Sequence, residues 1–102
     1  MSKQKEQTRN MNRQTVFANA AAGKEFWVAN GHVLRNLHDL SIAFEAMDGY
    51  TFGQHVSAEK NDFARWTLDV LKQDTLAKKL SESKSIEQHQ ITTLKHIVGL
   101  LK

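Results

Sequence analysis

Hydrophobic positions recur with helical spacing over most of the chain after residue 36. Apolar side chains fall at intervals of three and four within residues 37–47, 61–72 and 86–101. This spacing places them on one face of a helix. A shorter segment, 75–80, carries two leucines one turn apart and is expected to form another helix. The pattern predicts a mainly α fold of four or five helices.

Polar residues before these segments have the character of helix caps. Asn36 and Ser85 precede the first and last segments, where their side chains can accept from backbone N–H groups of the first turn. Thr51 and Gln54 have the spacing of a capping box, which predicts a helical turn beginning at Thr51. Gly49 is expected to end the preceding helix, because glycine is favoured just after a helix C-terminus.

Residues 25–35 give the clearest β signal in the chain. Phe26 and its neighbours are rich in strand-forming types, and Asn30-Gly31 is the preferred dipeptide of a two-residue type I′ hairpin turn. Alternation places Phe26 and Val28 on one face of the ribbon. A lone two-stranded hairpin is marginal in water, so we expect it to pack on the helices. The fold class is therefore α+β, mainly α with an N-terminal β-hairpin.

The length of 102 residues suits one domain. Residues 1–15 are almost entirely polar and are expected to form a disordered tail before a single globular domain, 16–102. This tail accounts for the net charge of +3, because the rest of the chain has as many acidic as basic residues. Its basic residues are Lys3, Lys5, Arg9 and Arg13.

The charge distribution limits the classes of partner that the sequence supports. A neutral domain is a poor candidate for an extended phosphate-binding surface, so nucleic acid is a possible partner only through the basic tail. A simple solubilising tail is the alternative. The absence of cysteine fits a cytoplasmic protein, and no apolar run reaches the roughly 20 residues of a membrane span.

The stretch 51–66 combines aromatic residues with special polar groups. His55 and Asp62 could form a general base with its orienting carboxylate, but no serine or cysteine nucleophile is clearly placed beside them. The alternative is that Asp62 or Asn61 caps a helix while His55 bonds the backbone in a turn. Trp66 fits a core position better than a binding site, and its indole N–H would then need an acceptor.

Other chemistry finds little support in the sequence. Phosphate-binding glycine loops, nucleophile elbows and closely spaced metal ligands are missing. His89 and His96 lie two turns apart, about 10 Å along a helix, which is too far for one metal ion. We therefore expect no cofactor and no metal, and do not expect an enzyme.

The last helix has a broad apolar stripe formed by Ile91, Leu94, Val98 and Leu101. A stripe of this kind normally faces the core of its own domain, which is the favoured interpretation. The alternative is a contact with a second copy. The sequence thus leaves open a monomer or a homodimer through the C-terminal helix.

The ordered series His55-Val56, Lys60-Asn61-Asp62-Phe63 and Trp66 resembles the signature of a small domain of unknown function found in archaea and bacteria. The signature is His-Val-x-x-x-Lys-Asn-Asp-Phe-x-x-Trp, and the wider resemblance covers about residues 24–81. It implies a compact fold in which the hairpin and helices meet around the Asn-Asp-Phe corner. It implies no catalytic residue.

These observations together favour a non-catalytic protein-interaction or accessory module. An enzyme or ligand binder using His55 and Asp62 is the less favoured alternative, beside the nucleic-acid hypothesis. The expected contact surface is the 51–66 corner with the hairpin turn. Its candidate residues are His55, Lys60, Asn61, Asp62, Arg65 and Trp66.

Overall fold

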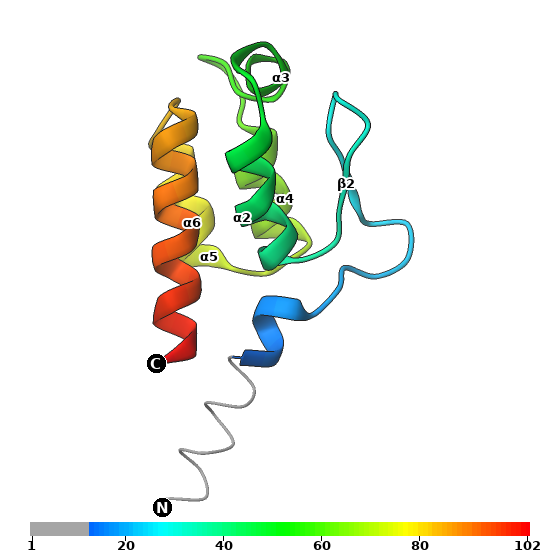
Figure 1. Ribbon diagram of the computed structural model, residues 1–102, viewed down its shortest axis with the longest axis vertical. Helices are drawn as coiled ribbons and strands as arrows, with labels where there is room; N and C mark the ends of the chain where they lie inside the picture. Colours follow the sequence, from blue (N-terminus) through cyan, green and yellow to red (C-terminus); the bar gives the residue numbers. More distant parts are fainter. Residues whose placement is uncertain (1–12) are drawn as a thin grey trace, which may run out of the picture.

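The computed structural model describes residues 13–102 and is mainly helical, with one two-stranded antiparallel hairpin (Figure 1). This confirms the predicted fold class. A short helical segment at 13–17 precedes the hairpin, so the last three residues of the expected tail are helical, while the rest of that tail lies outside the described residues. The later helices are α2 (Leu37–Ala46), α3 (Gly49–His55), α4 (Asp62–Asp69), α5 (Asp74–Ser81) and α6 (Ile86–Leu101).

The hairpin pairs β1 (Phe26–Trp27) with β2 (Val33–Leu34), so that Phe26 lies opposite Leu34. The predicted two-residue type I′ turn is wrong. That turn needs a positive φ at both central residues, whereas Gly31 has a φ of 95° and Asn30 is not among the positive-φ residues. The loop instead has three residues, closed by Gly31 N–H donating to Val28 O at 2.8 Å.

The two faces of the hairpin differ as the alternation predicted. Val28 is buried and Phe26 half-buried against the helices, while Trp27 is 70% exposed. The strands are only two residues long, so the ladder alone gives little stability. Packing of this inner face onto the helices therefore keeps the hairpin folded.

Three of the expected caps are present. Asn36, Asn61 and Ser85 each accept from the backbone N–H three residues ahead, at the N-termini of α2, α4 and α6. The prediction for Gly49 was wrong. Asp48 caps α3 by accepting from Thr51 N–H at 2.7 Å, so Gly49 opens α3 instead of ending α2. A stronger acceptor three residues earlier, Asp48, displaced the expected start at Thr51.

Phe63 on α4 occupies the centre of the core. Its side chain is fully buried, and its ring centroid lies 5.0 Å from that of Phe26, 5.1 Å from that of Phe44 and 5.9 Å from that of Phe52. Hairpin, α2, α3 and α4 therefore meet at one side chain. Around this centre α2 packs on α6, and α5 packs on both α4 and α6.

Helix α6 has the predicted bounds but presents a different face to the core. Its fully buried residues are His89 and Thr93, and Ile86, Ile97 and Leu100 pack beside them. The apolar stripe expected to face the core is between 41% and 52% exposed. That expectation was wrong because it assumed that apolar residues would be buried in preference to polar ones, whereas here polar side chains with hydrogen-bond partners take the core positions.

Candidate functional site

His55 and Asp62 lie on the two sides of the turn that joins α3 to α4. His55 is the last residue of α3 and Asp62 the first of α4. The turn is closed by Ser57 N–H donating to Lys60 O at 2.9 Å, and a bridge pairs Val56 with Asn61. This geometry brings His55 Nδ1 to 3.0 Å from Asp62 Oδ2. The polar pair suggested by the sequence therefore forms.

The second nitrogen of His55 is also occupied. Nε2 lies 2.9 Å from the backbone nitrogen of Ala29 in the hairpin loop. A backbone N–H can only donate, so Nε2 accepts and the proton of the neutral ring lies on Nδ1, directed at Asp62. A general base needs a lone pair that can reach a substrate. Here both nitrogens are used, and the side chain is only 12% exposed. The His55–Asp62 pair therefore links the hairpin loop to the α3–α4 turn, through the bond of His55 to Ala29.

Asn61 joins three helices through one side chain. Its Oδ1 accepts from Ala64 N–H at 3.0 Å and caps α4. Its Nδ2 donates to Leu80 O at 3.0 Å, at the end of α5, and to His89 Nε2 at 2.9 Å, on α6. The amide thus makes one accepted and two donated bonds, so its polar atoms are fully occupied within the molecule.

Trp66 has a similar internal role. The side chain is 6% exposed, and its ring lies 5.7 Å from that of Phe26, edge to face. Its indole N–H donates to Lys24 O at 2.7 Å, the acceptor that burial of a tryptophan requires. Of the candidate contact residues, His55, Asn61 and Trp66 are therefore engaged in holding the fold, and they offer little to a partner.

The other three candidates, Lys60, Asp62 and Arg65, lie together with Asn61 on an open groove between α4 and α5. The groove has a volume of about 380 Å³. Ala64, Leu68 and Ala77 give it an apolar floor, and its charged rim consists of Glu59, Lys60, Asp62, Arg65, Asp74 and Lys78. Lys60 Nζ lies 3.3 Å from Asp62 Oδ2, an exposed pair of the kind that adds little stability. Leu68 is 46% exposed.

The sequence interpretation missed the role of His89. Its Nδ1 donates to Ser85 O at 2.9 Å, which leaves Nε2 as the acceptor for Asn61. The ring also packs edge to face against Phe52, with centroids 4.9 Å apart. Burial lowers the pKa of His89, against the opposing effect of its bond to Ser85 O. One signal in the sequence could have identified His89 as a core residue. Positions 86, 89, 93, 97 and 100 also have helical spacing and so form one face of the helix.

The depressed pKa of His89 predicts loss of stability in mild acid. The unfolded chain takes up a proton near pH 6.5, whereas the folded chain resists protonation to lower pH. Between those two values the unfolded state binds more protons, so the free energy of unfolding falls as pH falls. This loss should be visible in urea unfolding between pH 7.5 and 5.

Two variants identify the histidine responsible. His89→Gln should flatten the pH dependence, and His32→Gln, a change at an exposed histidine, should leave it intact. Burial and the charge of Lys79 also lower the pKa of His96. A His96→Gln variant therefore measures how much of the pH dependence of the free energy of unfolding comes from His96. An unchanged slope in His89→Gln would contradict the assignment.

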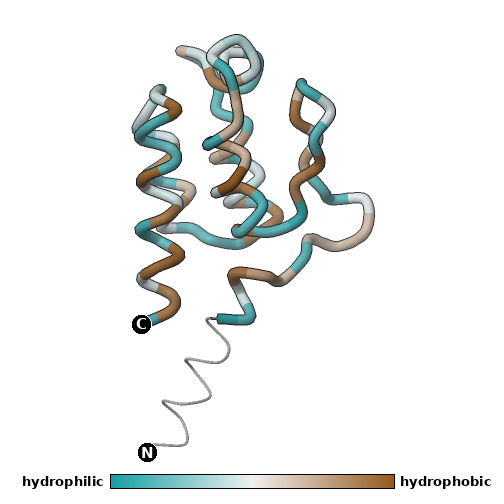
Figure 2. Tube along the Cα trace, viewed as in Figure 1, coloured by the Kyte–Doolittle hydropathy of each residue, from teal (hydrophilic) through white to brown (hydrophobic). Residues whose placement is uncertain are grey.

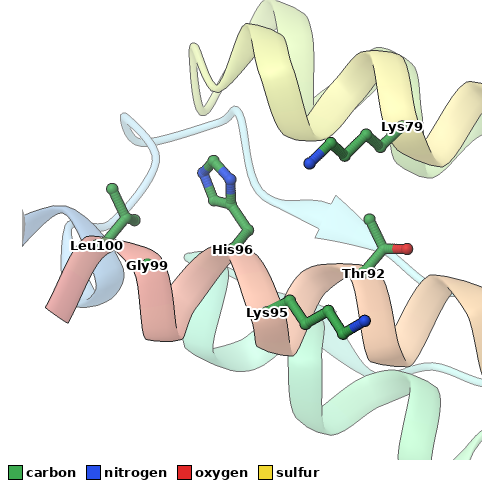
Figure 3. A pocket seen from close by; sticks show the side chains of 6 residues that line it. All are labelled: Lys79, Thr92, Lys95, His96, Gly99 and Leu100. Carbon is green, nitrogen blue, oxygen red and sulfur yellow. The ribbon is translucent and has the colours of Figure 1, made fainter. Parts of the chain in front are cut away.

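A second pocket, between α5 and α6, is basic (Figure 3). Its volume is about 480 Å³, and its lining includes Lys79, Lys95 and His96 but no acidic side chain. Lys79 extends from α5 toward α6, and His96 rises from α6 toward α5. His96 also bonds Gln73 Oε1 at 2.9 Å. The pocket is a local patch of positive charge beside α6.

Among residues 13–102 no three potential ligands lie together so that they could hold a metal ion. None of the helices in this part of the chain is long and apolar enough to cross a membrane. The predicted nucleic-acid contact through Lys3, Lys5 and Arg9 falls outside the described residues, and Arg13 lies on the exposed side of the first helical segment. Comparison with protein-family models, curated proteins and solved structures gave no match. The resemblance to a domain of unknown function stays a prediction.

Proposed function

We propose that the protein is a non-catalytic interaction module, which holds a segment of another protein in the α4–α5 groove. The observation that carries this proposal is a contrast around the α3–α4 turn between residues bonded within the fold and residues that line an open groove. His55, Asn61 and Trp66 are committed to internal bonds. The adjacent groove has an apolar floor and a charged rim, in which Asp62 bonds His55 and Lys60 and Glu59 bonds Ser57, while Arg65 and Lys78 are exposed.

The composition of the groove indicates the chemistry of the segment. Three acidic and three basic side chains line the groove together with its apolar floor. A partner segment with one or two apolar side chains flanked by charges of both signs would match this surface. Such surfaces gain specificity from the charged rim and affinity from the buried anchor. A cytoplasmic location is part of this proposal and rests on the absence of cysteine.

The catalytic alternative fits the geometry less well. His55 would have to release either Ala29 or Asp62 before its ring could exchange a proton with a substrate. Asp62 lines the groove, but His55 does not. A substrate bound in the groove would contact the Asp62 carboxylate but not the His55 ring that is needed as the base.

The test compares two matched variants in affinity capture from the source lysate. Leu68→Glu places a charge on the floor of the groove, whereas Ile42→Glu changes an equally exposed apolar residue on α2, at 49% against 46%. We expect Leu68→Glu to reduce recovery of a discrete protein at least tenfold and Ile42→Glu to leave it unchanged.

Two results would contradict the proposal. Equal recovery with Leu68→Glu and the unsubstituted chain would exclude the groove as the contact surface. Recovery that requires residues 1–15 and disappears after nuclease treatment would support the nucleic-acid hypothesis instead.

A further inference from the structure

Within residues 13–102, helix α6 has a continuous apolar face that no other described element covers. Its members are Ile91, Leu94, Val98 and Leu101, which are 44%, 44%, 52% and 41% exposed. They follow at intervals of three, four and three residues, so they form one stripe along the helix. Figure 2 shows hydrophobic positions on successive turns of α6, down to its C-terminal end.

The other sides of α6 are already in use. The side carrying His89 and Thr93 is buried in the core. The side carrying Thr92 and His96 lines the basic pocket shared with α5. In the part of the chain that the structure describes, the stripe is therefore the remaining apolar face of α6. Exposed apolar stripes of this kind mark interaction surfaces.

The residue types on the stripe indicate what covers it. The intervals of three and four match positions a and d of a heptad, with Ile91 and Val98 at a and Leu94 and Leu101 at d. β-Branched residues at a with leucine at d favour two-stranded packing. In a symmetric dimer the same patch serves both partners, so the stripe supplies both surfaces of the contact.

Residues 1–12 are poorly suited to cover the stripe. Their apolar content is limited to two methionines, Met1 and Met11, at opposite ends of the segment. The partner must carry several apolar side chains in helical register, and α6 of a second copy does so.

We propose that two copies of this chain associate through the α6 stripe. The helix has 16 residues and is about 24 Å long, so a helix pair buries on the order of several hundred Å² on each copy. This is at the low end of specific interfaces, which bury about 800 Å² on each partner. Two heptads are few for an isolated coiled coil, but α6 is already folded on its own domain. An interface of this size is expected to be weak, so the dimer should dissociate on dilution.

Sedimentation velocity of the full chain from 1 to 500 µM, at about 0.15 M salt, tests the proposal. The expected result is a shift from monomer to dimer across this range. Leu94→Glu introduces a buried unpaired charge into the contact and should weaken association at least tenfold. Ile42→Glu, at an equally exposed residue on α2, should leave it unchanged.

Circular dichroism and thermal unfolding establish that each variant is folded. Should Leu94→Glu fail to fold, Val98→Gln replaces it, since that residue is the most exposed of the four. A chain that stays monomeric at 500 µM overturns the proposal. Equal weakening by Ile42→Glu and by the stripe variant also overturns it. This surface is separate from the α4–α5 groove, so the two proposals fail independently.

Discussion

Replacing Asn61 by alanine is expected to lower the free energy of unfolding by about 3 kcal/mol. The change removes the cap of α4, which is worth about 1 kcal/mol. It also takes the donor from Leu80 O and from His89 Nε2, and a buried acceptor left without a partner costs about 1–3 kcal/mol. The measurement is urea unfolding at pH 7.5, followed by circular dichroism.

Two further variants separate the parts of this effect. Ser85→Ala removes a cap and an exposed bond to Glu87 but keeps Ser85 O as the acceptor for His89, so it should cost only about 1 kcal/mol. Asn61→Asp keeps the capping oxygen but places a carboxylate oxygen against Leu80 O and His89 Nε2, so it should lose both long-range bonds and add repulsion between acceptors. If Asn61→Ala costs no more than Ser85→Ala, the three-helix junction is energetically unimportant.

Phe63→Ala is expected to destabilise the protein by about 3–5 kcal/mol, because a fully buried phenylalanine leaves a cavity that its neighbours fill only in part. Small domains have total stabilities of about 5–15 kcal/mol. The variant should therefore lose a large part of its stability, with a melting temperature at least about 12 °C lower. Thermal unfolding by circular dichroism measures this shift.

Tyr50→Ala is the matched control for the core substitution. Tyr50 is also aromatic but 78% exposed, so its removal should change the free energy of unfolding by no more than about 0.5 kcal/mol. A loss of less than about 1 kcal/mol in Phe63→Ala would mean that the aromatic centre tolerates a cavity and does not organise the fold.

The sequence predicted the parts of this fold that depend on near neighbours. The caps Asn36, Asn61 and Ser85 bond backbone groups three residues away, so local spacing was enough to find them. The hairpin faces followed from alternation. The predicted type of the hairpin turn was wrong although it too is a local feature. The dipeptide Asn30-Gly31 also fits a three-residue loop in which only the glycine needs a positive φ.

The candidate site depended on bonds that no local pattern encodes. His55 reaches Ala29, 26 residues away, and Trp66 reaches Lys24, 42 residues away. His89 is polar by residue type and becomes a core residue only because Asn61 and Ser85 O satisfy its ring. The sequence therefore pointed to the residues around the α3–α4 turn. It could not distinguish side chains that form hydrogen bonds within the fold from side chains that are available to a partner.

The tethering of the hairpin by later residues has a consequence for synthesis of the chain. Residues 24–34 are synthesised before the side chains that hold them, because His55 and Trp66 are added 26 and 42 residues after their partners, Ala29 and Lys24. At about 5–20 residues per second, this is a delay of roughly 1–8 s. During that interval Phe26 lacks the rings of His55, Phe63 and Trp66, on which it packs in the folded protein. The inner face of the hairpin is therefore buried only after the residues of α4 have been added to the chain.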